Sequence, residues 1–214
     1  MSTRVCEDGH NPPKRAVRRP TQARSRATVD AILRGAAEVL TSRGYSATTT
    51  NHIADAAGVS IGSVYQYFAD KDDVVKAVAT MFARDALEFS GEHIHDGDDE
   101  LTQLRAWLDA VITRASQDEA LIHVLFREVP FIWTIPGVLE AMDDSLDVIE
   151  RLAPLNRVDE ARRRDRAFVI FKSMLAVIVD VAADPLLRSR RDGIVDELTL
   201  MIECYLMSTR QQPE

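Results

Sequence analysis

The chain has 214 residues, of which 46% are hydrophobic and 28% charged, a globular composition that excludes an intrinsically disordered protein. Its formal net charge of −8 is unevenly distributed. Residues 1–70 hold nine Lys/Arg and six Asp/Glu, which gives +3, whereas residues 71–214 hold seventeen and twenty-eight, which gives −11. The N-terminal part is therefore suited to meet a polyanion, and the acidic remainder is not.

Cysteine content and hydropathy limit the compartment. The two cysteines, Cys6 and Cys204, lie at opposite ends of the chain, which excludes a disulfide framework and a cysteine metal cluster. The N-terminus lacks the apolar segment of a signal peptide. The longest apolar stretch, 167–183, contains Lys172 and Asp180 and falls short of the roughly 20 residues that span a bilayer. We therefore expect a soluble, cytoplasmic protein without membrane contact.

Residues 1–24 are expected to form a flexible basic arm. Asn11-Pro12-Pro13 and Pro20 oppose helix formation. The arm and the residues that follow it carry several basic side chains: Lys14, Arg15, Arg18, Arg19, Arg24 and Arg26. Such a segment is either a solvated leader or an arm that lies along DNA phosphates or enters a minor groove.

Four helices are predicted next. Apolar residues at i, i+3 and i+4 spacing predict a helix over 26–43, which Gly44 ends. Shorter helices are predicted over 50–57 and 61–68, and a longer one over 71–91. A threonine among residues 48–50, then Ser60 and then Asp70 are expected to cap these three helices. Gly58 is expected to end the second helix in a left-handed conformation.

The remainder also has helical periodicity. The polar segment 91–100 is expected to be a loop, in which His93 and His95 are solvated rather than metal ligands, since residues i and i+2 do not share a helix face. Further helices are predicted over about 100–112, 121–126, 138–152, 159–183 and 191–209. No alternating strand pattern is present, so the fold class is all-α, and no metal or other cofactor is expected.

Residues 49–68 have the physical features of a helix-turn-helix. The small residue Ala54 permits close helix approach, Gly58 makes the turn, and apolar side chains such as Val64 fix the crossing angle. The outer face of the third helix is then free, and it consists of Ile61, Gly62, Ser63, Gln66 and Tyr67. None of these residues is acidic, which favours insertion into a DNA major groove.

The longer segment "TTTNHIADAAGVSIGSVYQYFADKDDVVKAV" resembles the N-terminal signature of the TetR family of bacterial transcriptional regulators. The matching residues are Thr49 or Thr50, Ile53, Ala54, Ala57, Gly58, Val59, Ser60, Gly62, Tyr65, Tyr67, Phe68 and Lys71. Ser63 stands where threonine is usual, and Val74 where leucine is usual. The resemblance covers about residues 26–80 in detail, and beyond them only the helical layout and the length agree.

The resemblance implies a homodimer that binds a palindromic operator and leaves it when a small molecule binds the C-terminal domain. It implies that Thr50 and Asn51 meet phosphates or base edges, that Ile61, Gly62 and Gln66 lie nearest the bases, and that Ser63, Tyr65 and Tyr67 contact backbone or bases. Lys71 would contact a phosphate. The residues themselves leave open that Tyr65 is a partly buried packing residue and that Lys71 is only a solvated helix start.

The predicted domains are the arm 1–24, a helix-turn-helix domain 25–71, and an effector-binding and dimerisation domain 72–214. The apolar helices within about 159–209 are expected to pair with a second copy as a four-helix bundle. Asp180 in this region is a surface acid, an ion-pair partner of an arginine or lysine across the dimer interface, or a ligand contact, and the first two are favoured.

The effector pocket is expected among helices from 100 to 183. Its candidate lining is Trp107, Phe126, Phe131, Trp133, Met142, Phe171 and Met174, although aromatic and methionine residues at helical spacing can also be plain core. The sequence contains no phosphate loop or nucleophile motif, and His123 and Glu128 do not share a helix face well, so an enzyme is not expected. An architectural DNA-binding protein without an effector, and a helix-turn-helix used for protein contact, are compatible with the same pattern.

Overall fold

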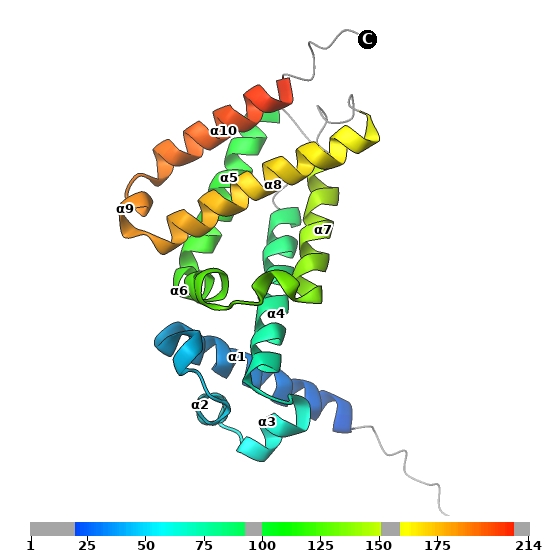
Figure 1. Ribbon diagram of the computed structural model, residues 1–214, viewed down its shortest axis with the longest axis vertical. Helices are drawn as coiled ribbons and strands as arrows, with labels where there is room; N and C mark the ends of the chain where they lie inside the picture. Colours follow the sequence, from blue (N-terminus) through cyan, green and yellow to red (C-terminus); the bar gives the residue numbers. More distant parts are fainter. Residues whose placement is uncertain (1–19, 93–99, 151–158, 208–214) are drawn as a thin grey trace, which may run out of the picture.

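All regular structure in the computed structural model is helical over the residues that it describes, which are 20–92, 100–150 and 159–207. The N-terminal part consists of α1 (Pro20–Ala47), α2 (Thr50–Ala57) and α3 (Ile61–Tyr67), and α4 (Lys71–Glu92) runs from it into the larger part (Figure 1). For this described portion, the prediction of an all-α fold is confirmed.

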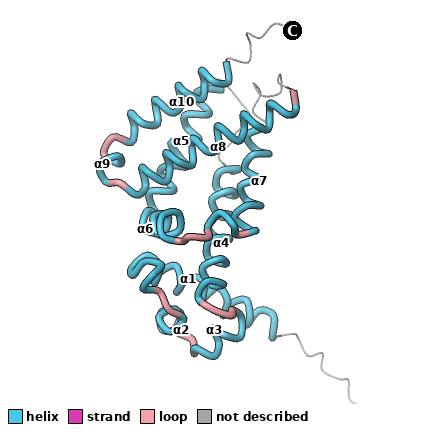
Figure 2. Tube along the Cα trace, viewed as in Figure 1, coloured by secondary structure: helices cyan, strands magenta, loops and turns pink. Residues whose placement is uncertain are grey.

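The helix α4 connects the N-terminal part to the larger part (Figure 1). Its elements are α5 (Glu100–Gln117), α6 (Glu119–His123), the π-helical turn η1 (Val124–Glu128), the 3-10 turn η2 (Ile132–Thr134), α7 (Pro136–Glu150), α8 (Glu160–Ala183), α9 (Pro185–Arg188) and α10 (Arg191–Met207). Short turns join most consecutive helices of the described chain (Figure 2). The helices α8 and α10 lie side by side at the end of the molecule farthest from α1 to α3 (Figure 1).

Local signals fix the helix ends in the N-terminal part. Thr49 precedes α2 and its hydroxyl accepts a hydrogen bond from the His52 N–H at 3.2 Å, and Ser60 caps α3 in the same way through the Ser63 N–H at 3.1 Å. Gly58 follows α2 with φ 65° and ψ 31°, the left-handed conformation that glycine adopts at least cost. Asp70 caps α4 by accepting from the Asp73 N–H at 2.9 Å. These predicted caps are confirmed.

The helices α1 and α2 cross so closely that no side chain fits at position 35. A Cβ atom placed on Gly35 would lie 2.6 Å from the backbone nitrogen of Ala57, so only glycine fits at this crossing. The sequence pattern pointed to Ala54 as the residue that permits close packing in this region. Ala54 is indeed buried, but the closest approach depends on Gly35, which was not predicted.

The buried side chains form two main clusters. The first joins Ile32, Ile53 and Val64 of the N-terminal helices to Val74 and Val78 of α4, and it extends into α6, η1, η2 and the start of α7. The second fills the space between α5, α7, α8 and α10. The first cluster therefore continues across the domain boundary that was predicted at residue 71.

Some element boundaries differ from the predictions. The helix α1 begins at Pro20, six residues before the expected start, because proline is well tolerated in the first turn of a helix. The turns η1 and η2 and the short helix α9 were not predicted, since one-turn elements leave little periodicity. Residues 1–19 of the expected arm, and the expected loop with His93 and His95, lie outside the described residues.

No helix in the described segments combines the length and the apolar character needed to cross a membrane.

Candidate nucleic-acid interface and ligand cavity

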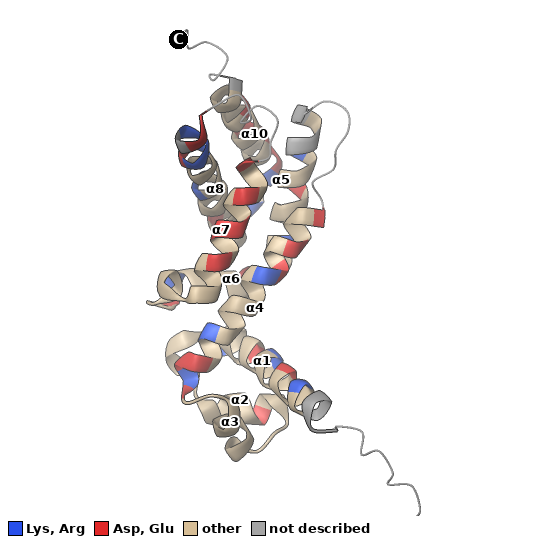
Figure 3. Cartoon of the chain, turned by 90° about the vertical axis from the view of Figure 1, so that its right-hand side faces the viewer, with Lys and Arg blue, Asp and Glu red and all other residues tan. Residues whose placement is uncertain are grey.

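The outer face of α3 is exposed and uncharged. Val64 points inward and is fully buried, whereas Ile61 is 37% and Tyr65 56% exposed, and Gly62 and Gln66 are exposed beside them. The Ser60 cap and the buried Val64 fix the orientation of this short helix. The face carries no acidic or basic side chain, as the charge colouring of Figure 3 illustrates.

The start of α2 is joined to this face by a hydrogen bond. The hydroxyl oxygens of Thr50 and Tyr65 lie 3.1 Å apart, and Asn51 is exposed next to Thr50. The exposure of Tyr65 argues against a role mainly in packing. The structure thus brings Thr50, Asn51 and Tyr65 together at one surface.

Three further predicted contact residues are partly buried or already bonded within the chain. Ser63 is half-buried, and its hydroxyl lies 2.8 Å from that of Ser60. Tyr67 is half-buried and packs against the first core cluster. The Lys71 ammonium donates a hydrogen bond to the carbonyl oxygen of Tyr45 at 3.0 Å and lies 4.2 Å from the centre of its ring, so it is neither a free cation nor a merely solvated helix start.

Tyr45 connects three elements at the junction between the two parts. Its N–H donates to the Glu128 carboxylate on η1 at 2.8 Å, and its hydroxyl donates to Asp72 on α4 at 2.9 Å. Its ring meets Phe131 edge-on, with the ring centres 5.9 Å apart. Burial and the Asp72 carboxylate raise the pKa of Tyr45 above its ordinary value, so the hydroxyl stays protonated and can donate.

Gly44 makes this junction possible. It has φ 75° and ψ 170°, a conformation that is nearly restricted to glycine, and it turns the chain after the main body of α1 as expected. A Cβ atom on Gly44 would lie 2.7 Å from Oε2 of Glu128. The lack of a side chain therefore lets the Glu128 carboxylate reach the Tyr45 N–H.

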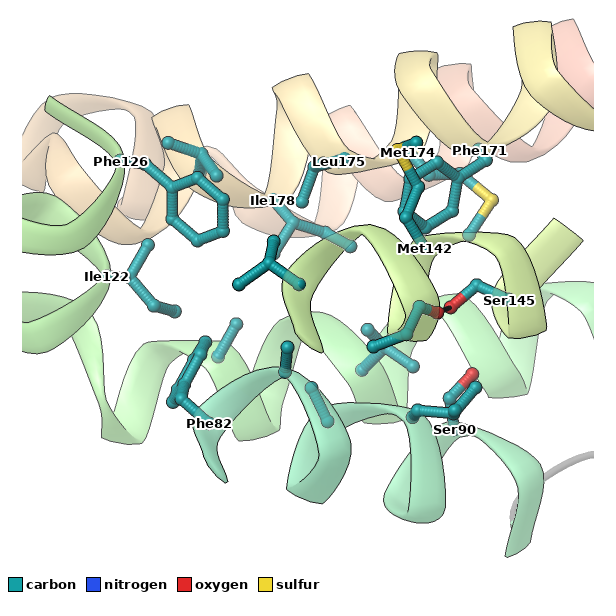
Figure 4. Close-up of a pocket in the computed structure, with 18 of the residues that line it drawn as sticks. Phe82, Ser90, Ile122, Phe126, Met142, Ser145, Phe171, Met174, Leu175 and Ile178 are labelled. Atoms are coloured by element: carbon teal, nitrogen blue, oxygen red, sulfur yellow. Dashed lines mark hydrogen bonds between the residues drawn. The ribbon is translucent and has the colours of Figure 1, made fainter. Parts of the chain in front are cut away.

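A cavity of about 170 Å³ lies in the larger part between α4, α5, α7 and α8, and η1 and η2 contribute to its wall (Figure 4). Six of the seven predicted lining residues line it: Trp107, Phe126, Trp133, Met142, Phe171 and Met174. The exception is Phe131, which instead packs against Tyr45 and the first core cluster. The sequence could not separate Phe131 from its neighbours because the irregular backbone around η2 breaks the helical periodicity.

The helix α4 supplies lining residues that were not predicted from the sequence. These are Ala79, Phe82, Ala83, Ala86, Leu87, Phe89 and Ser90. The pocket was expected among helices between residues 100 and 183, which does not include α4. A stripe of small and aromatic residues along α4 was the available signal, but such a stripe is also typical of ordinary core packing.

The cavity wall is almost entirely apolar. The Ser90 and Ser145 hydroxyls are among its few polar groups (Figure 4), and the Ser90 carbonyl accepts a hydrogen bond from the Trp107 indole at 3.0 Å. The lining also includes Arg114 and Asp118, which form an ion pair with each other. The wall therefore presents no unpaired charge among its described residues.

No group of three metal-ligating side chains occurs within residues 20–92, 100–150 and 159–207. Glu128, which the sequence places near His123, is occupied at the junction by the Tyr45 N–H.

Large apolar side chains are exposed on α8 and α10. Phe168 and Val169 of α8 are 45% and 46% exposed, and Leu200 and Met201 of α10 are 52% and 49% exposed. Asp180, also on α8, forms an ion pair with Arg127 of η1 within the same chain. The partner therefore lies within the same chain, whereas the expected ion pair was one across the dimer interface.

Comparison with known proteins assigns the N-terminal part. Residues 32–78 match the model of the family described as bacterial regulatory proteins, tetR family. The chain is 27% identical over 157 residues to the transcriptional activator FasR of Mycolicibacterium smegmatis, covering 71% of this chain and 68% of FasR. It is 37% identical over 78 residues to the transcriptional repressor KstR2 of Rhodococcus jostii, a match that spans 36% of each protein.

The whole fold is also found among solved structures. SmeT, the repressor of the Stenotrophomonas maltophilia multidrug efflux pump SmeDEF, superposes in its triclosan complex with a TM-score of 0.60 and 24% sequence identity, over 82% of this chain and 90% of SmeT. The curated relatives reported above are named as transcriptional regulators. Residues 32–78 are therefore similar to the N-terminal part of bacterial regulatory proteins of the tetR family, and the chain shares the helical fold of SmeT.

Proposed function

We propose that the chain is a ligand-responsive regulator that binds a palindromic DNA operator as a homodimer and leaves it when a small molecule fills the cavity. One observation carries this proposal. The helix α4 follows α3 after a three-residue link and packs against α1, and its later turns form a wall of the cavity. A ligand that displaces α4 would therefore also displace the surface offered to DNA.

The proposed DNA contacts follow from the exposed face of α3. Gln66 can pair bidentately with adenine, and Ile61 can pack on a thymine methyl group. Thr50, Asn51, Ser63, Tyr65 and Tyr67 would hold the backbone or neighbouring bases. Lys71 retains donors beyond the one that Tyr45 uses, so it can still reach a phosphate.

The proposed dimer would use α8 and α10. A palindromic site requires two recognition helices related by a twofold axis. The exposed side chains Val169, Leu200 and Met201 would be covered by a second copy, which is the expected use of such a surface. The dimer would thus form at the end of the molecule away from DNA.

The proposed coupling between the two sites runs through η1 as well as α4. Leu125 and Phe126 of η1 line the cavity, and Glu128 at the end of the same turn accepts the Tyr45 N–H. A ligand that prefers one arrangement of η1 and α4 would shift the population between DNA-bound and released states. Such a cavity favours an effector-controlled regulator over an architectural protein without an effector.

The test begins with selection of binding sequences from a random DNA pool by the purified full chain. We expect a palindromic site, with affinity that falls steeply as salt rises because phosphate contacts release counterions. The selected operator is then challenged with metabolite mixtures to find what releases it. Failure to bind any pool above background at low salt would contradict the proposal. Whether the protein represses or activates depends on where the operator lies.

A further inference from the structure

We propose that the cavity takes an amphipathic anion, a long apolar tail that ends in a carboxylate, and that Lys172 at the edge of the cavity holds the carboxylate. The proposal starts from two observations. Lys172 is half-buried and forms no ion pair with a described residue, and it lies next to a cavity whose described wall has no unpaired charge. This inference rests on the proposed effector role of the cavity and names the chemical class of the effector.

Lys172 lies on α8 against aromatic rings that belong to the cavity wall. Its ammonium nitrogen is 4.2 Å from the centre of the Trp133 ring and 6.0 Å from that of Phe171, both of which line the cavity. A third ring, Phe168, has its centre 5.8 Å away. The cation therefore sits beside the cavity without being part of its lining.

No acidic side chain of the described residues neutralises this cation. Arg114 of the cavity wall pairs with Asp118, and Arg127 of η1 pairs with Asp180. Burial alone lowers the pKa of Lys172, with no carboxylate raising it again. Cation–π contacts compensate only part of the lost hydration, so an incoming anion would gain a full charge partner there.

The wall determines the rest of the ligand. The helix α8 contributes Phe171, Met174, Leu175 and Ile178 to the wall (Figure 4). Phe126 and Ile122 lie at the other end of the cavity from Phe171. A flexible hydrocarbon tail gains from burial against such a surface. A second charged group on the tail would lose its hydration without a partner in the wall. One anionic head on an apolar tail is thus the class that fits both features.

The test compares three probes that share one tail: dodecanoate and dodecyltrimethylammonium, each below its micelle-forming concentration, and dodecan-1-ol below its aqueous solubility. Binding to the full chain is measured by titration calorimetry. We expect dodecanoate to bind at least about fivefold more tightly than dodecan-1-ol, as one charge-assisted contact provides, and the cation to bind most weakly. Equal affinity for acid and alcohol would overturn the inference.

The variant Lys172→Met keeps an apolar stem of similar length and removes the charge. We expect it to abolish the preference for dodecanoate while leaving dodecan-1-ol binding unchanged. The control is Lys76→Met, which removes the same charge from α4, where Lys76 pairs with Asp73. The role of Lys172 would be contradicted if the preference for dodecanoate survived Lys172→Met, or if Lys76→Met lost it equally. It would also be contradicted if Lys172→Met changed the oligomeric state and left the selectivity unchanged.

The same probes separate this inference from the proposed function. If dodecan-1-ol binds and releases the operator as well as dodecanoate does, the effector role of the cavity stands and the anion inference fails. If the protein binds no DNA, the proposed function fails, and the calorimetric selectivity still decides the ligand class. If none of the probes binds, the inference fails whatever the DNA result.

Discussion

Single residues at the junction carry a specific structural requirement. Gly44 has φ 75° and ψ 170°. A Cβ atom on this residue would also lie 2.7 Å from Oε2 of the Glu128 carboxylate. Backbone conformation and space therefore both select glycine here. By contrast, Gly91 of α4 has an ordinary φ and open space where a Cβ would be.

We expect Gly44→Ala to lower the free energy of unfolding by about 1–3 kcal/mol, because alanine is strained in this backbone region. Chemical denaturation with circular dichroism measures the change. The control Gly91→Ala should be neutral or slightly stabilising, since alanine favours a helix interior over glycine. Equal stability of Gly44→Ala and the wild type would show that the junction relaxes freely.

Gln66 is exposed on α3, outside the buried clusters, so its replacement should act on recognition alone. We expect Gln66→Ala to change the preference for one base pair of each half-site by about 1–3 kcal/mol, without lowering thermal stability. Competition binding with single-base variants of the selected operator measures it. A uniform loss of affinity across all variants would instead indicate a phosphate contact.

At the scale of elements, η1 joins two functions in five residues. Leu125 and Phe126 face the cavity, and Glu128 faces the N-terminal part through the Tyr45 N–H. Its π-helical hydrogen bonding advances the chain less per residue than an α-helix would. The turn therefore changes the direction of successive side chains within a short length, which suits an element that must contact both parts.

We expect Glu128→Gln to weaken the coupling between ligand and DNA while leaving ligand affinity unchanged. The charged hydrogen bond to Tyr45 is worth about 1.5–3 kcal/mol, and coupling free energies are of similar size, so the ligand-induced change in operator affinity should fall several-fold. Operator affinity measured with and without saturating ligand gives the coupling. Arg127→Gln, which removes the neighbouring pair with Asp180, is the control and should change the coupling less.

The elements that local chemistry determines could be predicted from the sequence. Thr49, Ser60, Gly58 and Asp70 act within four residues of their own position, so their capping and turn roles are legible in the sequence alone. Lys71 and Phe131 were predicted less well, because the positions of both depend on Tyr45, which is far away in sequence. The cavity-lining role of α4 escaped prediction for the same reason, since it arises only where α4 packs against distant helices.

At the scale of the whole molecule, the exposed apolar surface of α8 and α10 and the outer face of α3 are separated along the long axis. The exposed apolar side chains of α8 and α10 lie at the end opposite α3, whose outer face carries no charged side chain (Figure 1). The acidic residues of α7 also lie in the larger part, away from α3 (Figure 3). This arrangement permits two copies to pair through α8 and α10 while the outer face of α3 in each copy remains exposed.

We expect the wild type to be a dimer at micromolar concentration and the double variant Leu200→Glu, Met201→Glu to be a monomer, since two buried carboxylates would lack partners. Light scattering measures the molar mass. Leu139→Glu is the control, because Leu139 is also exposed but lies on α7 near α4. A wild-type monomer, or dissociation caused by Leu139→Glu alone, would contradict the assignment of the dimer surface.

The cavity wall also determines the tryptophan fluorescence of the protein. The chain has two tryptophans, Trp107 and Trp133, and both line the cavity, while the DNA-facing part has none. Indole emission from this protein therefore originates entirely at the cavity. If the proposed function holds, a change in emission when operator is added must have reached the cavity through α4 or η1. The protein thus carries an intrinsic optical measure of the communication between its two ends.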